Sequence, residues 1–191
     1  FVPQPTIQKD ILSLIFERQT EMLKDYQPIY VRNGFDFLVC PYPIKMDNPQ
    51  HQNILHYYFK NCMLELSEAI FAYEQNQDLH AIEEVIDAMH FLVEGSIMAG
   101  FDLFEGQRDN EQCRYTLIYN TFKSKLDFNT LIVQILKVYG GAMNCFKNKP
   151  WKQTPVPTDV NHFRNLFRDT WVAFIGLLTC LELKPEDVLK Y

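Results

Sequence analysis

The chain has no run of basic residues, and its 18 Lys and Arg are outnumbered by 24 Asp and Glu, which gives a formal net charge of −6. Such a balance argues against duplex nucleic acid or an anionic membrane as the main partner. It does not argue against a nucleotide, because metal ions can bridge an acidic site and a phosphate. The charge balance therefore excludes neither a nucleotide nor another small ligand bound through metal ions.

The sequence also lacks paired cysteines, a secretory leader and a long apolar run. Its five cysteines are odd in number and show no Cys-x-x-Cys spacing, which indicates free thiols in a reducing cytoplasm. The first residues have no charged start followed by an apolar core, and no stretch approaches the length of a transmembrane helix. We expect a cytoplasmic protein with no membrane segment.

Apolar residues are plentiful: 47% of the 191 residues are hydrophobic, including 15 Phe and 10 Tyr. That is enough material for one domain, 1–191, with a substantial core. Apolar residues recur at helical spacing along most of the chain, and the proline-rich stretch 27–50 predicts an irregular loop. The fold class is therefore all-α, with helices expected over 7–26, 51–75, 79–99, 111–125, 129–139, 159–181 and from 185 onward.

Two acidic pairs dominate the central part of the sequence, Glu65 with Glu68 and Glu84 with Asp87. A spacing of three residues places both carboxylates of a pair on one helix face. The polar turn 76–78 lies between the two helical stretches and predicts an antiparallel hairpin. With a rise of about 1.5 Å per residue, all four carboxylates fall within about 8 Å of one another along the hairpin axis. Converging hard oxygen ligands suit Mg²⁺, with Mn²⁺ as the alternative.

Ordinary helix decoration is the other interpretation of these acids. Glutamate is a good helix former, so acidic pairs at this spacing occur in helices that bind nothing. The stretches 62–71 and 82–93 are apolar nearly all round, which predicts that both helices lie in the interior. Buried carboxylates are costly unless they are paired or bound to metal. From the residues alone, both interpretations remain open.

The same residues carry a family resemblance. Glu-Leu-Ser-Glu at 65–68, followed by Glu-Val-Ile-Asp-Ala-Met-His-Phe at 84–91, resembles the all-α nucleoside triphosphate pyrophosphatases, and most of all the dimeric dUTPases and phage dCTP pyrophosphatases. Weaker similarity surrounds Gln19 in the first helix and extends over 181–191. The stretch 101–157 has no counterpart in the resemblance, which implies an inserted helical segment.

The resemblance implies a homodimeric enzyme that hydrolyses a pyrimidine deoxynucleoside triphosphate to the monophosphate and pyrophosphate, with dUTP favoured and dCTP next. All four acids would hold Mg²⁺, and Glu65 or Glu68 would position or deprotonate the attacking water. Residues near the substrate would be Gln19 at the base, His90 and Phe91 along the nucleotide pocket, and Arg168, Lys184 and Lys190 toward the phosphates. For His90 and Phe91, plain core packing is the alternative.

Two departures from the family pattern keep a second function in view. The family continues from the last segment into a cluster of Tyr, Lys, Asn and Arg that grips the phosphates, whereas this sequence stops at Tyr191. We expect both ends to be trimmed relative to the gene product. The spacer between the acidic pairs is also shorter than in dimeric dUTPases and lacks their Trp. The alternative is a catalytically inactive nucleotide-binding or regulatory protein on the same scaffold.

Overall fold

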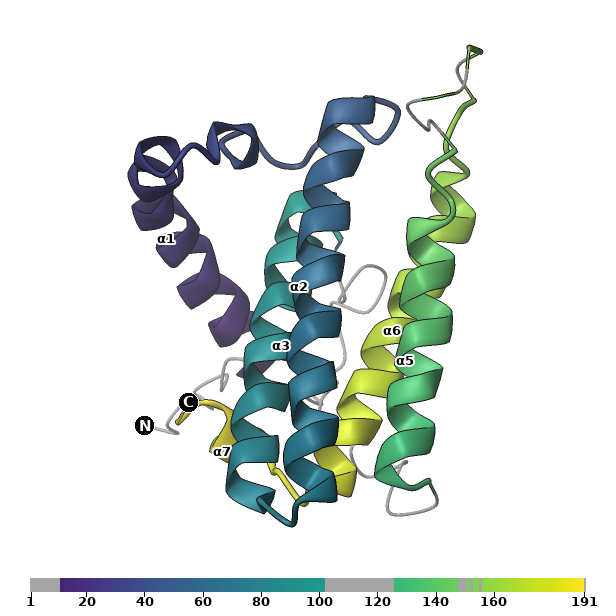
Figure 1. Ribbon diagram of the computed structural model, residues 1–191. Helices are drawn as coiled ribbons and strands as arrows, with labels where there is room; N and C mark the ends of the chain where they lie inside the picture. Colours follow the sequence, from purple (N-terminus) through teal and green to yellow (C-terminus); the bar gives the residue numbers. More distant parts are fainter. Residues whose placement is uncertain (1–10, 102–125, 148–150, 152, 155, 191) are drawn as a thin grey trace, which may run out of the picture.

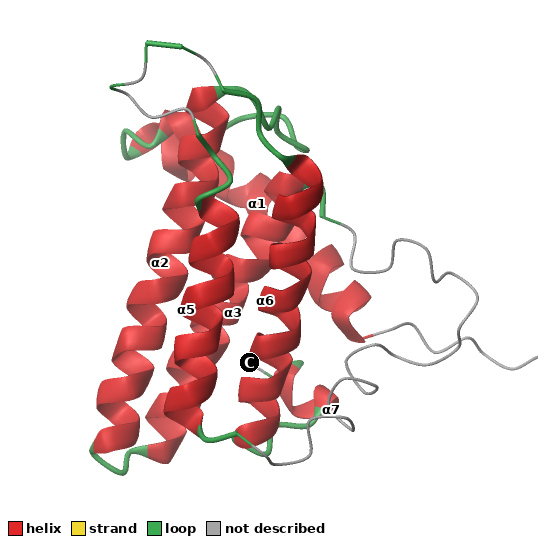
Figure 2. Cartoon of the chain, turned by 90° about the vertical axis from the view of Figure 1, so that its right-hand side faces the viewer, coloured by secondary structure: helices red, strands yellow, loops and turns green. Residues whose placement is uncertain are grey.

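The computed structural model describes residues 11–101, 126–147, 151, 153–154 and 156–190, and this part is helical without strands (Figure 1; Figure 2). The all-α prediction is confirmed, while the pyrophosphatase type of bundle stays a prediction. None of the described helices combines the length and the apolar character that crossing a bilayer requires. In chain order the elements are α1 (Ile11–Arg32), the 3₁₀ turn η1 (Asp36–Leu38), α2 (Pro49–Glu74), α3 (Asp78–Ala99), α5 (Phe128–Met143), α6 (Val160–Cys180) and α7 (Pro185–Val188).

The helices α2 and α3 form the predicted antiparallel hairpin (Figure 1). Asn48 caps α2, because its side-chain oxygen accepts a hydrogen bond from the backbone N–H of Gln50 at 2.9 Å, and Pro49 occupies the first turn, where no N–H is needed. The connecting turn passes through Asn76 at φ 58°, a left-handed conformation that Asn tolerates. Gly100, at φ 61°, ends α3.

The helices α5 and α6 form a second antiparallel pair beside this hairpin (Figure 1). Aspartates begin both helices: Asp127 accepts a hydrogen bond from Thr130 N at 3.0 Å, and Asp159 accepts one from His162 N at 2.9 Å. Buried aromatic side chains fill the space inside the bundle, with ring centroids 5.1–5.4 Å apart. This aromatic core includes Tyr139, Phe163, Phe167 and Trp171.

The helix α1 lies outside the two pairs and packs against α3 and η1. Its apolar stripe, Leu12, Ile15 and Leu23, is buried against the hairpin. Figure 1 shows α1 crossing α3 at an angle, so that α1 covers one stretch of α3 and leaves other turns uncovered. This placement decides which part of α3 can face a ligand.

Some element boundaries differ from the sequence prediction. The first helix continues through Pro28 to Arg32, because the added turns bring Tyr30 against the core, which compensates for the hydrogen bond that proline cannot donate. The helix α5 runs through Gly140 and Gly141 instead of ending there. A side chain at Gly141 would place its Cβ 3.3 Å from Leu166 of α6, so this glycine serves close helix packing.

Two further predictions concern the loops and the stretch 101–157. Residues 36–38 form a 3₁₀ turn within the stretch 27–50, for which the sequence predicted an irregular loop. The helix predicted over 111–125 lies outside the described residues. Within the described part of 101–157, α5 packs against α6 and α2.

Candidate metal centre

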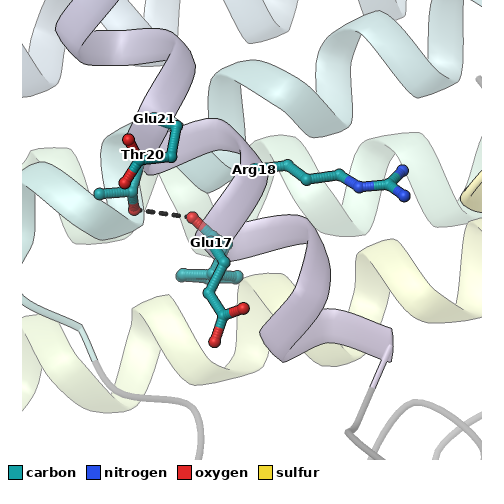
Figure 3. A pocket seen from close by; sticks show the side chains of 5 residues that line it. Glu17, Arg18, Thr20 and Glu21 are labelled. Atoms are coloured by element: carbon teal, nitrogen blue, oxygen red, sulfur yellow. Dashed lines mark hydrogen bonds between the residues drawn. The ribbon is translucent and has the colours of Figure 1, made fainter.

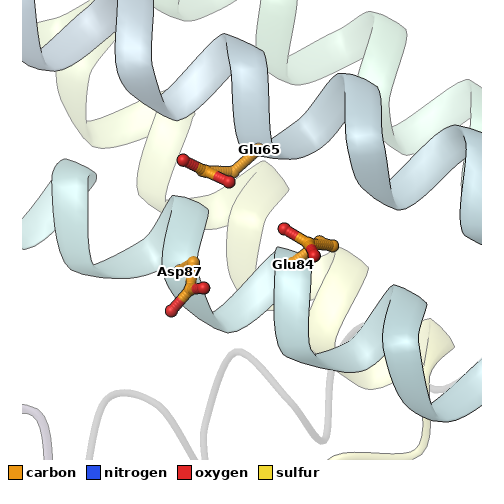
Figure 4. A group of neighbouring side chains, drawn as sticks. All are labelled: Glu65, Glu84 and Asp87. Atoms are coloured by element: carbon orange, nitrogen blue, oxygen red, sulfur yellow. The ribbon is translucent and has the colours of Figure 1, made fainter.

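Three carboxylates meet across the α2–α3 hairpin. Glu65 comes from α2, and Glu84 and Asp87 come from adjacent turns of α3 (Figure 4). Each offers an oxygen, and these oxygens all lie within 4.8 Å of one another. The helix register that brings them together is held by buried neighbours such as Leu66 and Val85, which pack in the core between the helices. The arrangement can hold one divalent cation on oxygen ligands.

The three carboxylates differ in burial and charge. Glu84 is 9% exposed, Glu65 is half-buried and Asp87 is exposed. Burial, a hydrogen bond with Glu84 and the negative charges of Glu68, Glu84 and Asp87 together raise the pKa of Glu65 to about 7, and burial contributes most. Without a cation, the cluster therefore retains a proton near neutral pH. A bound cation would replace that proton and relieve the repulsion.

Glu68, the fourth predicted ligand, lies at the edge of the group. It is exposed and does not contribute an oxygen to the three that converge. Its charge nevertheless acts on Glu65. The structure thus brings together three of the four predicted ligands and leaves Glu68 at the rim, within electrostatic range.

Two histidines flank the cluster on α3. His80 Nδ1 lies 3.2 Å from Glu84 Oε1, and His90 Nδ1 lies 3.8 Å from Asp87 Oδ1. Burial lowers the pKa of His90, and the charge of Asp87 opposes that shift.

Phe91 lies on α3, four residues after Asp87, and Gln19 lies on α1, which packs against α3. Phe91 is half-buried and packs against the core. Gln19 is buried, and its Nε2 donates a hydrogen bond to Glu94 Oε1 at 2.8 Å. Glu94 was not among the predicted site residues, because the prediction rested on acidic pairs at three-residue spacing and Glu94 belongs to no such pair. The available signal was a single carboxylate inside an apolar stretch, seven residues after Asp87 and hence on the same helix face.

The basic residues assigned to the phosphates lie at the other end of the chain. Arg168 is exposed on α6, and Lys184 is exposed at the start of α7. Lys190 Nζ lies 2.6 Å from Asp187 Oδ1, so it already forms an ion pair. Their contact with phosphate stays a prediction.

The acidic cluster lines neither of two prominent open hollows on the surface of the described residues. One, of about 490 Å³, lies along α1 and includes Thr20, whose Oγ1 donates to the carbonyl of Phe16 at 2.7 Å (Figure 3). The other, of about 700 Å³, lies between η1 and the start of α2 and includes His51 and Tyr57. Glu17 and Glu21 line the first hollow and Asp36 the second, but none of them belongs to the three converging carboxylates, so the hollows do not extend the candidate metal centre.

No family model, no curated protein and no solved structure matches this chain significantly. Fold and site together define an all-helical protein with a candidate divalent-cation centre on a helical hairpin.

Proposed function

We propose that the chain is a Mg²⁺-dependent nucleoside triphosphate pyrophosphohydrolase that acts on pyrimidine deoxynucleotides. The observation that supports this most directly is the convergence of Glu65, Glu84 and Asp87 within 4.8 Å on two packed helices. The motif resemblance at 65–68 and 84–91 supplies the reaction class. The proposal joins these two lines of argument.

The residues present fit a hard divalent cation. All three donors are carboxylate oxygens, which suit Mg²⁺ or Mn²⁺ rather than a thiophilic metal. Burial is the main cause of the raised pKa of Glu65, about 7, and the negative charges of Glu68, Glu84 and Asp87 add to it, so a cation would be favoured at this position. Mg²⁺ commonly takes one or two protein carboxylates together with substrate phosphates and water, so three carboxylates leave room for a triphosphate.

Bound Mg²⁺ would neutralise phosphate charge and lower the pKa of a water molecule. The chain's own residues would supply orientation and a proton acceptor. Glu84, the most buried of the three, fixes the centre on the hairpin, and Asp87 faces the solvent side from which a triphosphate approaches. Glu65 or Glu68 accepts the proton of the attacking water. The water oxygen bonds to phosphorus, and the phosphorus–oxygen bond to the leaving group breaks.

The proposal includes a homodimer. Large apolar side chains are exposed on α2 and α5, namely Leu64, Phe71, Val133 and Leu136. Scattered exposed apolar residues are ordinary, but a second copy would cover several at once. Sedimentation equilibrium tests this part independently: a mass twice the 22.6 kDa of the chain supports it, and a monomer at micromolar concentration refutes it.

The decisive experiment measures pyrophosphate release from dUTP, dCTP, dTTP, dATP, dGTP and the ribonucleotides, with Mg²⁺ and with EDTA. We expect metal-dependent release from a pyrimidine deoxynucleotide. Glu84→Gln should reduce it by about 100-fold or more, since a positioned ligand is lost, whereas Glu83→Gln, an exposed neighbour on the same helix, should not. No release from any nucleotide by folded protein would favour the inactive nucleotide-binding alternative.

A further inference from the structure

A second polar group is buried two helical turns from the acidic cluster. Glu94 follows Asp87 by seven residues on α3, and Tyr58 precedes Glu65 by seven on α2. Seven residues correspond to roughly 10 Å along a helix and return to the same face. Because α2 and α3 are antiparallel, both steps lead toward the same end of the hairpin. The acidic cluster and this second group therefore follow one another along the contact between α2 and α3, which we call the seam.

This second group is closed and incompletely satisfied. Gln19 of α1 and Glu94 of α3 are 5% and 4% exposed, and one N–H of the Gln19 amide donates to Glu94 Oε1 at 2.8 Å. Tyr58 is fully buried, and its hydroxyl makes no hydrogen bond within the described residues. Burial raises the pKa of Tyr58, and the charge of Glu94 raises it as well. The hydroxyl of Tyr30 acts on that pKa as a hydrogen-bond partner does, although the two phenols do not have the geometry of a hydrogen bond. An unpaired buried hydroxyl costs free energy, which a ligand atom would recover.

The exposed fraction of the side chains decreases along the seam from Asp87 in the acidic cluster toward Glu94. Asp87 is open, with a side chain 61% exposed, and His90 and Phe91 are half-buried. Glu94 is covered, since α1 packs over this end of α3. A nucleotide with its phosphates at the acidic cluster would thus place its base between α1 and α3, beside Glu94.

We propose that Glu94, oriented by Gln19, reads the edge of the base and selects an aminopyrimidine over uracil, so that dCTP is preferred to dUTP. This inference rests on the proposed function and reverses the order that the family resemblance implied. A carboxylate accepts a hydrogen bond from the exocyclic amine of cytosine. The second N–H of Gln19 donates to the ring nitrogen N3, and the Tyr58 hydroxyl is free to donate to a carbonyl oxygen. The existing Gln19–Glu94 bond would stay in place.

Uracil matches this pair less well. Its single donor, N3–H, is flanked by two carbonyl oxygens, and at least one of them would face the lone pairs of the Glu94 carboxylate. Electrostatic repulsion between acceptors in a buried site is costly, because little water is present to screen it. Glu94 therefore discriminates mainly by rejecting the keto edge.

The test measures binding rather than turnover. Isothermal titration calorimetry with dCMP and with dUMP gives the ratio of their dissociation constants for wild-type protein, Glu94→Gln and the exposed control Glu83→Gln. The titrations are run with Mg²⁺ at a pH of about 8.5, because burial raises the pKa of Glu94 to about 7 and the carboxyl group must be ionised. We expect wild type and Glu83→Gln to bind dCMP about tenfold more tightly. In Glu94→Gln the ratio should approach one, because the new amide can also donate to the uracil carbonyl.

The outcomes separate this inference from the proposed function. Tighter binding of dUMP by wild type, equal binding of the two, or a ratio that Glu94→Gln leaves unchanged would overturn the role of Glu94, even if nucleotides are hydrolysed. Selective binding of dCMP without any pyrophosphate release would instead refute the enzyme and leave the base site standing. The wild-type ratio decides the direction by itself, so the inference remains testable should Glu94→Gln fail to fold.

Discussion

The indole Nε1 of Trp171 on α6 donates a hydrogen bond to Ser96 Oγ on α3 at 3.0 Å. The Ser96 hydroxyl also donates a hydrogen bond, to the carbonyl of Leu92 at 2.7 Å, so it acts as acceptor and donor at once. Both side chains are almost completely buried. This bond joins the hairpin that carries the acidic cluster to the second helical pair, so it fixes the site within the bundle.

Ser96→Ala should destabilise the fold. The substitution leaves the Trp171 N–H buried without an acceptor, which costs about 1–3 kcal/mol of unfolding free energy. Urea denaturation followed by circular dichroism measures the change. The exposed Ser67→Ala on α2 serves as the control and should shift stability by less than about 0.5 kcal/mol. Equal effects of the two substitutions would contradict the importance of the bond.

Gly100→Ala should destabilise the fold more than Gly34→Ala. Both glycines have positive φ, 61° and 80°, so alanine pays a left-handed penalty of about 1–2 kcal/mol at either position. At Gly100 the new Cβ would also lie 2.5 Å from the Cβ of Pro43, whereas nothing lies within 4 Å at Gly34. Comparing the melting temperatures of Gly100→Ala and Gly34→Ala isolates the contribution of the clash with Pro43. Similar melting temperatures would show that the loop around Pro43 moves aside at little cost.

Mg²⁺ should stabilise the protein through the acidic cluster. A cation that binds only the folded state adds about 2.7 kcal/mol at a hundredfold excess over its dissociation constant. Differential scanning fluorimetry across a Mg²⁺ titration should show a saturable rise in melting temperature. Glu65→Gln and Glu84→Gln should abolish the rise, and Glu83→Gln should retain it. A rise that persists in all three variants would point to nonspecific screening.

Stability without divalent cations should fall as the pH rises from about 4.5 to about 7. Burial raises the pKa of Glu94 to about 7, and burial together with neighbouring carboxylates raises the pKa of Glu65 to about 7. The folded state then binds more protons than the unfolded chain in this window, so the free energy of unfolding decreases with pH and levels off above it. Urea midpoints at pH 5, 6, 7 and 8 measure the slope.

The variant Glu94→Gln is the control for this pH dependence of stability. Glu94→Gln removes one of the two titrations and should flatten the profile, with its largest relative gain above pH 7. Mg²⁺ should flatten the profile of wild type as well, because it favours the ionised form of Glu65. Parallel profiles for wild type and Glu94→Gln would show that the buried carboxyl group titrates as it does in the unfolded chain.

The hairpin and three of its four converging acids could be predicted from sequence because both depend on local rules. A helix places residues at known heights, and the short turn fixes the pairing of α2 with α3. Rotation about each helix axis is not fixed in this way. Glu68 lies about 60° around α2 from Glu65, so the helix contact that buries Leu66 turns Glu65 toward α3 and leaves Glu68 at the rim.

Features that depend on the position of α1 could not be predicted from the sequence. Gln19 and Glu94 are 75 residues apart, and only the docking of α1 onto α3 brings them within hydrogen-bond distance. The continuation of α1 through Pro28 has a similar origin, since packing of Tyr30 against the core outweighs the local penalty of proline. Long-range packing thus decided the Gln19–Glu94 contact, while local periodicity decided the acidic cluster.

The hairpin origin of the metal centre also bears on how the chain folds. Glu65 and Glu84 are only 19 residues apart, so closing the α2–α3 turn brings their charges together before distant contacts need to form. When no cation is bound, the carboxylates of Glu65 and Glu84 repel each other, and this repulsion opposes the closing of the hairpin. Refolding in Mg²⁺ should therefore be faster than refolding in EDTA if the hairpin forms in the rate-limiting step, and the three acids would then influence the folding rate as well as the stability of the folded state.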